Sequence, residues 1–425
     1  MGIAIETRLA LLLGISVVVL GFAACATLSP REQEVQVAPS VLSNYLADKP
    51  EALREHYSMV MVQGPRNEVL NQMRSGLAAY ELGAMPVATE SFDRALQSIE
   101  AVYADNPDAA KARELFTRES YKDFKGEPYE RAMAYYYRGL LYMREGDYQN
   151  ARASFKGGIL QDAFAEEEQN RADFALLIFL EGWASHCAGD PSLARESFAE
   201  LTKLKPDFVL PGDGHNTVVL VETGSAPVKF ADGTKREFLR YRRGDGVDEP
   251  RVDIEIDSGE ARTAYSMEDI FFQASTRGGR PIDYILAGKV NFKEGTETAG
   301  RVLKTVGFAT MAAGLSSRNN YATLAGGAVT IFGLVADGIA AAVRPEADAR
   351  YWDNLPDKVH VLSLALDPGP HAVQARVLDG SANPIEGLVR TAALDVSGKC
   401  ALAWLRSRTA LPTDVRAPGT ITQPK

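Results

Sequence analysis

Histidine and cysteine are the residue types in this 425-residue chain best suited to chemistry, and both are scarce. His186 and Cys187 are adjacent, whereas two metal ligands on one helix face are usually separated by three or four positions. The pair therefore favours core packing over a metal site. His215, in the string Gly212-Asp213-Gly214-His215-Asn216, has a more enzyme-like setting, although such a string is also typical of a turn. We favour the turn and keep a hydrolase that uses His215 as the less favoured hypothesis.

Catalytic motifs of the common kinds are absent from the sequence. It contains no glycine-rich phosphate loop ending in Lys-Ser or Lys-Thr, no nucleophile-elbow serine and no His-Glu-x-x-His pair. The 56 acidic and 46 basic residues give a formal net charge of −10, which disfavours a dedicated nucleic-acid binder because phosphates attract basic surfaces. We therefore expect neither an enzyme nor a protein that needs a metal or a cofactor.

The cysteines Cys25, Cys187 and Cys400 are too few for a disulfide scaffold. Cys187 and Cys400 could pair in an oxidising compartment, but they fall in different expected domains. We therefore expect these two to be reduced, buried thiols.

The first 24 residues have the pattern of a secretory signal peptide. Arg8 precedes an apolar run from Leu9 to Leu20, which is too short to span a bilayer. The string Phe22-Ala23-Ala24-Cys25 that follows resembles a bacterial lipobox, which implies that Cys25 is acylated and begins the mature chain. Ala26 in place of aspartate implies sorting to the periplasmic face of the outer membrane, as in similar lipoproteins. The alternative is ordinary cleavage after Ala24.

The first half of the chain repeats one pattern of small and aromatic residues at offsets 0, 7, 12, 16 and 19. Each copy has a glycine, a second glycine, an alanine, a phenylalanine and a final small or apolar residue. The first copy begins at Gly76, the second at Gly139 and the third at Gly182. This pattern resembles the tetratricopeptide repeat, in which a small residue lets two helices cross closely and the aromatic fills the gap. A plain antiparallel bundle is the other interpretation.

The first helix of each such repeat would line a concave face that is mainly apolar and aromatic. A groove of this kind predicts docking of a partner helix or extended segment, because large apolar patches mark interaction sites. The other hypothesis is that the chain's own insertion or second half fills the groove. The groove residues are Met73, Leu77, Tyr80, Tyr136, Leu140, Met143, Phe179 and Trp183.

After Pro206 the pattern changes from helical to alternating. It predicts strands at Thr217–Glu222 and Val252–Asp257, and a hairpin around Asp232-Gly233. Val359–Leu366 and Ala372–Val377 flank an Asp-Pro-Gly-Pro turn and predict a second hairpin. Leu394–Val396 and Cys400–Leu405 add at least one more strand. Together they indicate a small, mainly antiparallel sheet.

A glycine- and alanine-rich apolar segment interrupts these strands. Its second limb, Tyr321–Val343, is 23 residues long and is charged only at Asp337. Small residues recur at spacings that allow close helix contact in membranes. We favour a helical hairpin buried in protein over one in contact with a membrane. The residues singled out in this hairpin are Gly326, Gly327, Gly333, Asp337 and Gly338.

Three further strings resemble an uncharacterised family of bacterial outer-membrane lipoproteins with tetratricopeptide repeats. Members of that family are often encoded beside lipoproteins similar to the curli secretion channel, which implies protein partners of that kind. The resemblance supplies no catalytic residues. The strings are Tyr121–Arg131, Gly224–Lys229 and Ala347–Pro356.

The expected fold is a multidomain α+β protein with helical repeats followed by a mainly antiparallel β domain that carries the apolar hairpin. The expected function is that of a lipid-anchored periplasmic scaffold in an envelope assembly, with no nucleic-acid partner and with homo-oligomerisation left open. The alternative is a transport or secretion pore in which residues 300–343 contact the membrane. The expected parts are a signal peptide (1–24), a tether (25–40), helical repeats (41–210), a β-rich region (211–298), the apolar hairpin (299–345), a second β-rich region (346–408) and a disordered tail (409–425).

Overall fold

The computed structural model describes residues 34–104, 123–162, 173–233, 238–244, 251–276 and 347–408. The chain divides into two compact units, and the described residues from Val37 onward belong to one of them. Cys25 and the apolar hairpin with Gly326, Gly327, Gly333, Asp337 and Gly338 lie outside the described residues, as does the tail from residue 409.

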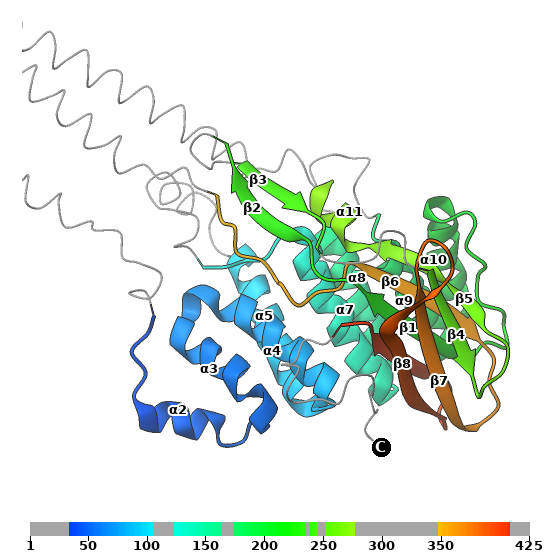
Figure 1. The fold of residues 1–425 in the computed structure, drawn as a ribbon, viewed down its shortest axis with the longest axis horizontal. Coiled ribbons are helices and arrows are strands. Elements are labelled where there is room, and N and C mark those ends of the chain that lie inside the picture. Colours follow the sequence, from blue (N-terminus) through cyan, green and yellow to red (C-terminus); the bar gives the residue numbers. More distant parts are fainter. Residues whose placement is uncertain are drawn as a thin grey trace, which may run out of the picture. The chain divides into compact units, whose positions relative to one another are not determined.

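The helices of the described unit occur mainly as consecutive pairs (Figure 1). Each first helix ends at a glycine in the left-handed region, where a side chain would be strained: Gly83, Gly146 and Gly189 have φ of 84°, 73° and 81°. The turn glycines predicted from the repeat are therefore confirmed. The pairs are preceded by two α-helices, α2 (Pro39–Leu46) and α3 (Arg54–Gln63), and by two short 3-10 helices, η2 (Glu51–Leu53) and η3 (Pro65–Asn67). The pairs are α4 (Glu68–Leu82) with α5 (Met85–Ala104), α7 (Pro128–Glu145) with α8 (Tyr148–Asp162), and α9 (Ala175–Ala188) with α10 (Pro191–Leu204).

A glycine of each first helix lies against a phenylalanine of the second. A β-carbon on Gly182 would come within 2.6 Å of the Phe198 ring, and one on Gly76 within 3.1 Å of the Phe92 ring. On Gly139 a β-carbon would overlap the Phe155 ring still further. These helices therefore approach closely only because the position carries no side chain, as the repeated pattern predicts.

The strands form a curled seven-stranded sheet with the order β8-β7-β4-β5-β6-β1-β9. Every neighbouring pair is antiparallel except β1 and β9, which run parallel. Its two edges approach each other, because Arg390 of β8 donates hydrogen bonds to the carbonyl oxygens of Arg406 and Ser407 at the end of β9. The strands are β1 (Thr217–Thr223), β4 (Arg251–Ile256), β5 (Arg262–Asp269), β6 (Lys358–Leu364), β7 (Gly369–Leu378), β8 (Pro384–Val396) and β9 (Ala401–Arg406).

The chain is therefore of the mixed α+β class. The predicted strands are present, and the hairpin at Asp232-Gly233 is confirmed as the separate ribbon of β2 (Val228–Asp232) and β3 (Phe238–Arg242). The hairpin predicted across the Asp-Pro-Gly-Pro turn is wrong. β6 pairs with β1 and β5, whereas β7 pairs with β4 and β8. The β4–β5 hairpin lies between them in the sheet, so adjacency in sequence does not give pairing here. A short helix, α11 (Ile270–Ser275), follows β5.

The strands β1 and β9 are covered on both faces, so each is buried along its whole length. One face packs on the helices through alternate residues such as Val218, Leu220 and Trp404. The other face closes on itself around Val219, Val221 and aliphatic side chains of the remaining strands. Alternation along a strand places successive side chains on opposite faces, so the apolar run Val218–Val221 of β1 supplies residues to both cores.

Cys187 of α9 and Cys400 beside β9 form a disulfide, with Cα atoms 5.7 Å apart across 213 residues of sequence. The expectation of two reduced thiols is therefore wrong. That expectation assumed that the helices and the strands form separate domains. The sheet instead packs directly on the helices, so the two cysteines meet at the seam between them.

Candidate functional site

The side chains predicted to line a docking groove are all buried, with at most 5% of their surface exposed. Residues from the second half of the chain cover them. The Trp404 ring lies edge-on to Tyr80 with centroids 4.8 Å apart, and Trp352 lies 5.7 Å from Tyr137. In the structure, the chain's own second half therefore fills this groove, which was one of the two hypotheses. The buried residues are Met73, Leu77, Tyr80, Tyr136, Leu140, Met143, Phe179 and Trp183.

An extended segment, residues 347–357, crosses the helical array and is called the strap below. Its Trp352 is fully buried and packs on Phe92 and Tyr137 from two successive helix pairs. The backbone N–H of Trp352 donates to Glu130 Oε1 at 2.6 Å, and the Arg350 guanidinium donates to Asn67 Oδ1 at 2.6 Å. The strap is therefore held both by its indole and by hydrogen bonds to its backbone.

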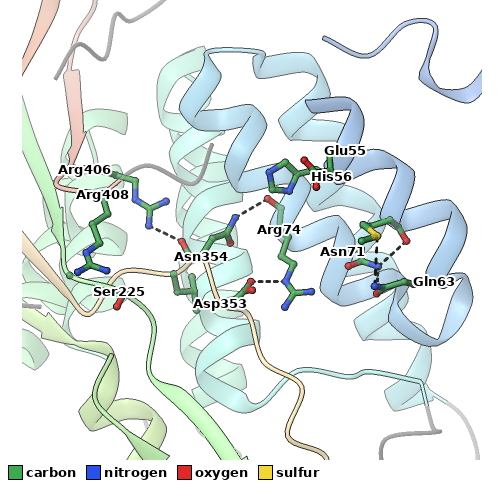
Figure 2. Close-up of a pocket in the computed structure, with 13 residues that line it drawn as sticks. Glu55, His56, Gln63, Asn71, Arg74, Ser225, Asp353, Asn354, Arg406 and Arg408 are labelled. Atoms are coloured by element: carbon green, nitrogen blue, oxygen red, sulfur yellow. Dashed lines mark hydrogen bonds and ion pairs between the residues drawn. The ribbon is translucent and has the colours of Figure 1, made fainter. Parts of the chain in front are cut away.

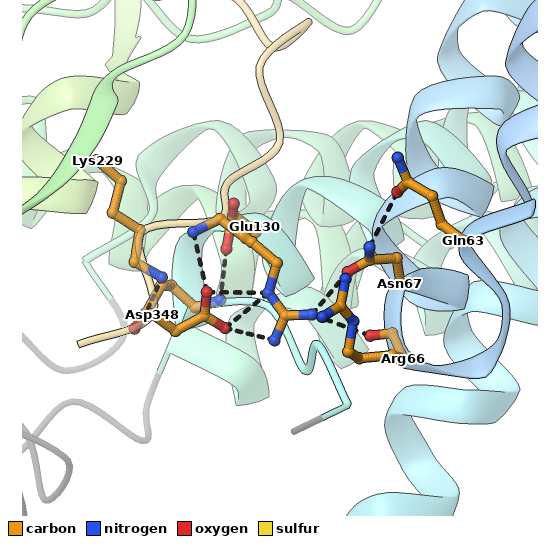
Figure 3. Close-up of polar contacts among 8 residues, drawn as sticks. Gln63, Arg66, Asn67, Glu130, Lys229 and Asp348 are labelled. Atoms are coloured by element: carbon orange, nitrogen blue, oxygen red, sulfur yellow. Dashed lines mark hydrogen bonds and ion pairs between the residues drawn. The ribbon is translucent and has the colours of Figure 1, made fainter. Parts of the chain in front are cut away.

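The three strings that carry the family resemblance meet at one junction, to which the strap itself contributes the third string (Figure 3). Glu127 and Glu130 come from the first string, Lys229 from the second and Arg350 from the third. Lys229 Nζ lies 2.7 Å from Glu127 Oε1, and the Glu127 backbone N–H donates to Glu130 Oε2 at 2.6 Å. Burial raises the pKa of Glu130. Burial alone would lower the pKa of Lys229, but the negative groups around it, Glu127 first among them, together outweigh burial and raise this pKa.

A second buried polar centre lies around Glu222 of β1. Its carboxylate accepts hydrogen bonds from the hydroxyls of Tyr136 and Tyr137 at 3.2 and 3.0 Å. It also accepts from Trp404 Nε1 at 2.8 Å and lies 3.1 Å from Arg406 Nε. Burial raises the pKa of Glu222, and the Arg406 guanidinium is the largest opposing influence. This centre is closed to solvent, so it joins the helices to the sheet and offers no access to a ligand.

An open cleft of about 580 Å³ lies beside the strap (Figure 2). This volume is within the range of small-molecule and peptide sites. α3 and α4 form one wall, and the strap, the turn after β1 and the end of β9 form the other. The lining residues are Glu55, His56, Met59, Gln63, Asn71, Arg74, Gly224, Ser225, Asp353, Asn354, Leu355, Arg406 and Arg408.

Polar groups of the cleft hold the strap in place. Arg74 Nε lies 2.7 Å from Asp353 Oδ1, and its Nη2 donates to the Tyr351 carbonyl oxygen at 3.1 Å. Arg406 Nη2 donates to the Asn354 carbonyl oxygen at 2.7 Å, and Asn354 Nδ2 donates to the Arg74 carbonyl oxygen at 3.1 Å. The cleft can therefore recognise carbonyl and carboxylate oxygens. Ser225, His56 and Glu55 are among the lining residues, but Ser225 lies apart from His56 and Glu55 (Figure 2), so they are not arranged as a nucleophile, a base and an orienting acid.

His215 lies outside this cleft, in the turn before β1. Its Nδ1 is 3.1 Å from Ser363 Oγ, and its backbone carbonyl lies 2.8 Å from His186 Nε2. Burial lowers the pKa of His215. A serine and a histidine in contact suggest a nucleophile and a base, but no carboxylate orients the imidazole within the described residues. His186 stacks on Trp183, with ring centroids 5.2 Å apart, as core packing requires.

The described ranges hold neither a metal site nor a helical membrane span. No cluster of three or more metal-ligating side chains occurs there. No helix in that part of the chain has the length and apolar character to cross a membrane.

Comparison with protein-family models, curated proteins and solved structures finds no match to this chain. We therefore infer the function from the geometry and from the sequence patterns.

The cleft was missed by sequence reasoning because its walls come from distant parts of the chain. Arg74 and Asn71 are on α4, whereas Arg406 and Arg408 are near the end of the described chain. The string Ala347–Pro356 was the usable indication, since it contains three of the lining residues: Asp353, Asn354 and Leu355.

Proposed function

We propose that this protein is a lipid-anchored scaffold on the periplasmic face of a bacterial outer membrane. Its helix pairs, which we interpret as tetratricopeptide-like repeats, and its sheet form one framework that presents the cleft to a protein partner. Lipoproteins similar to the curli secretion channel are partners that the family resemblance suggests. We propose no catalytic role for His215 or for any other residue.

The observation that carries the proposal is the contrast between two recesses on the same framework. The apolar groove of the helical array is filled by the chain's own strap and sheet. The polar cleft beside it remains open and has hydrogen-bonding groups on both walls. An open recess on a framework without a catalytic constellation among its described residues supports binding rather than turnover.

The disulfide supports an extracytoplasmic location. Disulfides persist in oxidising compartments such as the periplasm and are rare in the cytosol. Cys187 and Cys400 form such a bond at the seam between helices and sheet. This agrees with an exported chain anchored through Cys25, but it does not by itself identify the membrane.

The test is photocrosslinking of the full chain in the bacterial envelope from two exposed positions. Met59 lines the cleft and is 41% exposed, and Leu160 on α8 is 57% exposed and lies outside the cleft. A photoreactive residue at Met59 should give a discrete crosslinked species in the outer-membrane fraction, and one at Leu160 should not. Equal crosslinking from both positions would contradict a docking site in the cleft.

Fractionation tests the anchor separately. The Cys25→Ser variant should appear in the soluble periplasmic fraction, because the acyl chains would be its attachment to the membrane. Retention of this variant in the outer membrane would contradict anchoring through Cys25 alone.

A further inference from the structure

The described chain leaves its last strand at the cleft. Arg406 is the final residue of β9, and both it and Arg408, where the description ends, line the recess (Figure 2). The sequence continues for 17 more residues, 409–425, which are called the tail below. The first residue of the tail is therefore attached to a wall of the cleft.

This attachment gives the tail an advantage over any free ligand of equal affinity. A segment joined to its site by a short flexible link has an effective concentration in the millimolar range. Leu411 is three positions beyond Arg408, and three extended residues span roughly 10 Å, which is enough to enter a recess of about 580 Å³. Weak contacts are therefore sufficient for the tail to occupy the cleft.

The strap shows that the walls of the cleft accept the backbone of an extended segment. Arg74 Nη2 donates to the carbonyl oxygen of Tyr351, and Arg406 Nη2 donates to that of Asn354. Both acceptors belong to the chain itself. A second extended segment of the same chain would meet donors of the same kind on the helical wall.

The prolines of the tail suit those donors. Pro412, Pro418 and Pro424 favour an extended chain whose carbonyl oxygens have no partner within the segment. On the helical wall, Gln63 Nε2 lies 3.8 Å from the sulfur of Met59, which is a weak acceptor. This amide therefore has a donor to offer to a carbonyl oxygen.

The side chains of the tail match both the apolar and the charged lining. Met59 is 41% exposed, and Leu411 and Val415 are apolar residues that can cover it. Asp414 and Arg416 give the tail both signs of charge, and each wall of the cleft also carries both signs. A segment of mixed charge suits such a lining better than a segment of one sign. The charged lining residues are Glu55 and Arg74 on the helical wall and Asp353, Arg406 and Arg408 on the other.

We infer that the tail occupies the cleft in the absence of a partner and must leave it before the partner docks. Competition with a partner rests on the proposed docking function, whereas occupancy by the tail does not. The contact is autoinhibitory, because it covers Met59 and the donors of the cleft until a partner of higher affinity displaces it. The resident of the cleft is thus a segment of the same chain rather than a second copy or a lipid.

Photocrosslinking of the purified full chain in detergent, without a partner, identifies the occupant. A photoreactive residue at Met59 should crosslink mainly to a peptide from residues 409–425, and one at Leu160 on α8 should not. A mixture of unlabelled and isotope-labelled protein assigns the origin of each crosslink. Crosslinks within one chain join peptides of the same label, whereas crosslinks to a second copy give mixed pairs.

Two full-length variants test which part of the tail is held. The double variant Leu411→Ser, Val415→Ser should reduce the crosslink from Met59 to the tail about fivefold, because it removes the apolar side chains nearest to Arg408. Ile421→Ser, at the far end of the tail, is the matched control and should stay within about twofold of wild type. Both variants leave every described residue unchanged, so damage to the described fold does not account for a difference between them.

The bacterial envelope supplies the test of competition. Deletion of residues 409–425 should raise the yield of the partner crosslinked from Met59 about threefold, because the partner no longer competes with an attached segment. The double variant Leu411→Ser, Val415→Ser should produce a similar rise in the full-length chain.

The inference is overturned if Met59 crosslinks mainly to a second copy or to lipid, or if deletion of the tail leaves the yield of the partner unchanged. Partner species from Met59 would still appear in those cases, so the proposed function would stand. Conversely, a crosslink to the tail without a partner species from either chain would contradict the proposed function and would support occupancy of the cleft by the tail.

Discussion

The indole Nε1 of Trp404 on β9 donates a 2.8 Å hydrogen bond to the carboxylate of Glu222 on the adjacent parallel strand, β1. The same carboxylate is bound by two tyrosine hydroxyls of α7 and by the Arg406 guanidinium. One buried acid therefore connects two strands and a helix. Buried ion pairs of this kind are weak sources of net stability, but removal of one member is costly because the other charge stays buried.

Glu222→Gln should lower the free energy of unfolding by about 3 to 5 kcal/mol, because it leaves the buried charge of Arg406 without its partner. The measurement is urea denaturation followed by tryptophan fluorescence. Glu196→Gln on the exposed face of α10 is the control and should stay within about 0.5 kcal/mol of wild type. Equal stability of the two variants would show that the Glu222 centre is dispensable.

Loss of the Cys187–Cys400 bond should destabilise the chain by about 2 to 5 kcal/mol, since the bond closes a long loop between α9 and β9. The double variant Cys187→Ser, Cys400→Ser should match wild type that has been reduced with dithiothreitol. Reduction should have no further effect on the double variant. Thermal unfolding in the presence and absence of reductant measures each of these differences.

Trp352→Ala should lower the free energy of unfolding by about 3 to 5 kcal/mol. The indole fills the space between Phe92 and Tyr137, and the strap cannot collapse into the cavity that its loss would leave. Tyr351→Ala, at the neighbouring and partly exposed position, should cost less. Limited proteolysis should cut within the strap of the Trp352 variant first. A larger loss for Tyr351 than for Trp352 would contradict the burial pattern described here.

Alanine at the three crossing glycines should destabilise in a graded order. Gly139→Ala should be worst, Gly182→Ala intermediate and Gly76→Ala mildest, since the overlap with the facing phenylalanine decreases in that order. The largest effect should be about 1 to 3 kcal/mol. Gly214→Ala meets no neighbouring atom within 4 Å and serves as the control. Calorimetric midpoints of the four variants test the order directly.

His360 should make stability fall with pH below neutrality. Burial, with a smaller contribution from Lys358, lowers the pKa of His360 to about 3 from its ordinary 6.5. The unfolded chain therefore binds a proton between these values that the folded chain does not. The contribution of His360 to the free energy of unfolding is fully present above pH 6.5 and is lost as the pH falls towards 3. The slope of this loss is up to about 1.4 kcal/mol per pH unit.

The check is a comparison of slopes rather than of absolute stabilities. His360→Gln should show a shallower loss of stability than wild type between pH 6.5 and pH 4, whatever its stability at pH 7. The carboxyl groups of Glu130 and Glu222 have raised pKa values and favour the folded state as the pH falls, so they act in the opposite direction in both proteins. Identical slopes would show that His360 does not titrate as described.

Local patterns were sufficient to predict the helix pairs and most strands. The recurring glycine, alanine and phenylalanine positions predict the turns at Gly146 and Gly189, since these depend on neighbours within one pair. The alternation of apolar and polar residues predicts β4, again because it depends only on near neighbours in the sequence. The partners of β6 and β7 could not be predicted this way, because the β4–β5 hairpin that separates these two strands ends at Asp269, far before β6 begins at Lys358.

The features that could not be predicted from the sequence, namely the disulfide, the covered groove and the cleft, all depend on long-range contacts. Cys187 and Cys400 meet only because the sheet packs on the helices, and nothing near either residue indicates the other. The same packing covers the aromatic groove, which local reasoning left open between a partner and the chain itself. The cleft combines α3, α4, the strap and the end of β9, so its arginines belong to no local motif.

The position of β9 also determines when the molecule can be finished during synthesis. β1 ends at Thr223, but its two partners, β6 and β9, begin only at Lys358 and Ala401. Trp352 and Trp404, which cover the aromatic face of the helices, are made equally late. A chain that is still growing therefore keeps that face uncovered, and we expect it to depend on chaperones until its last strand has emerged.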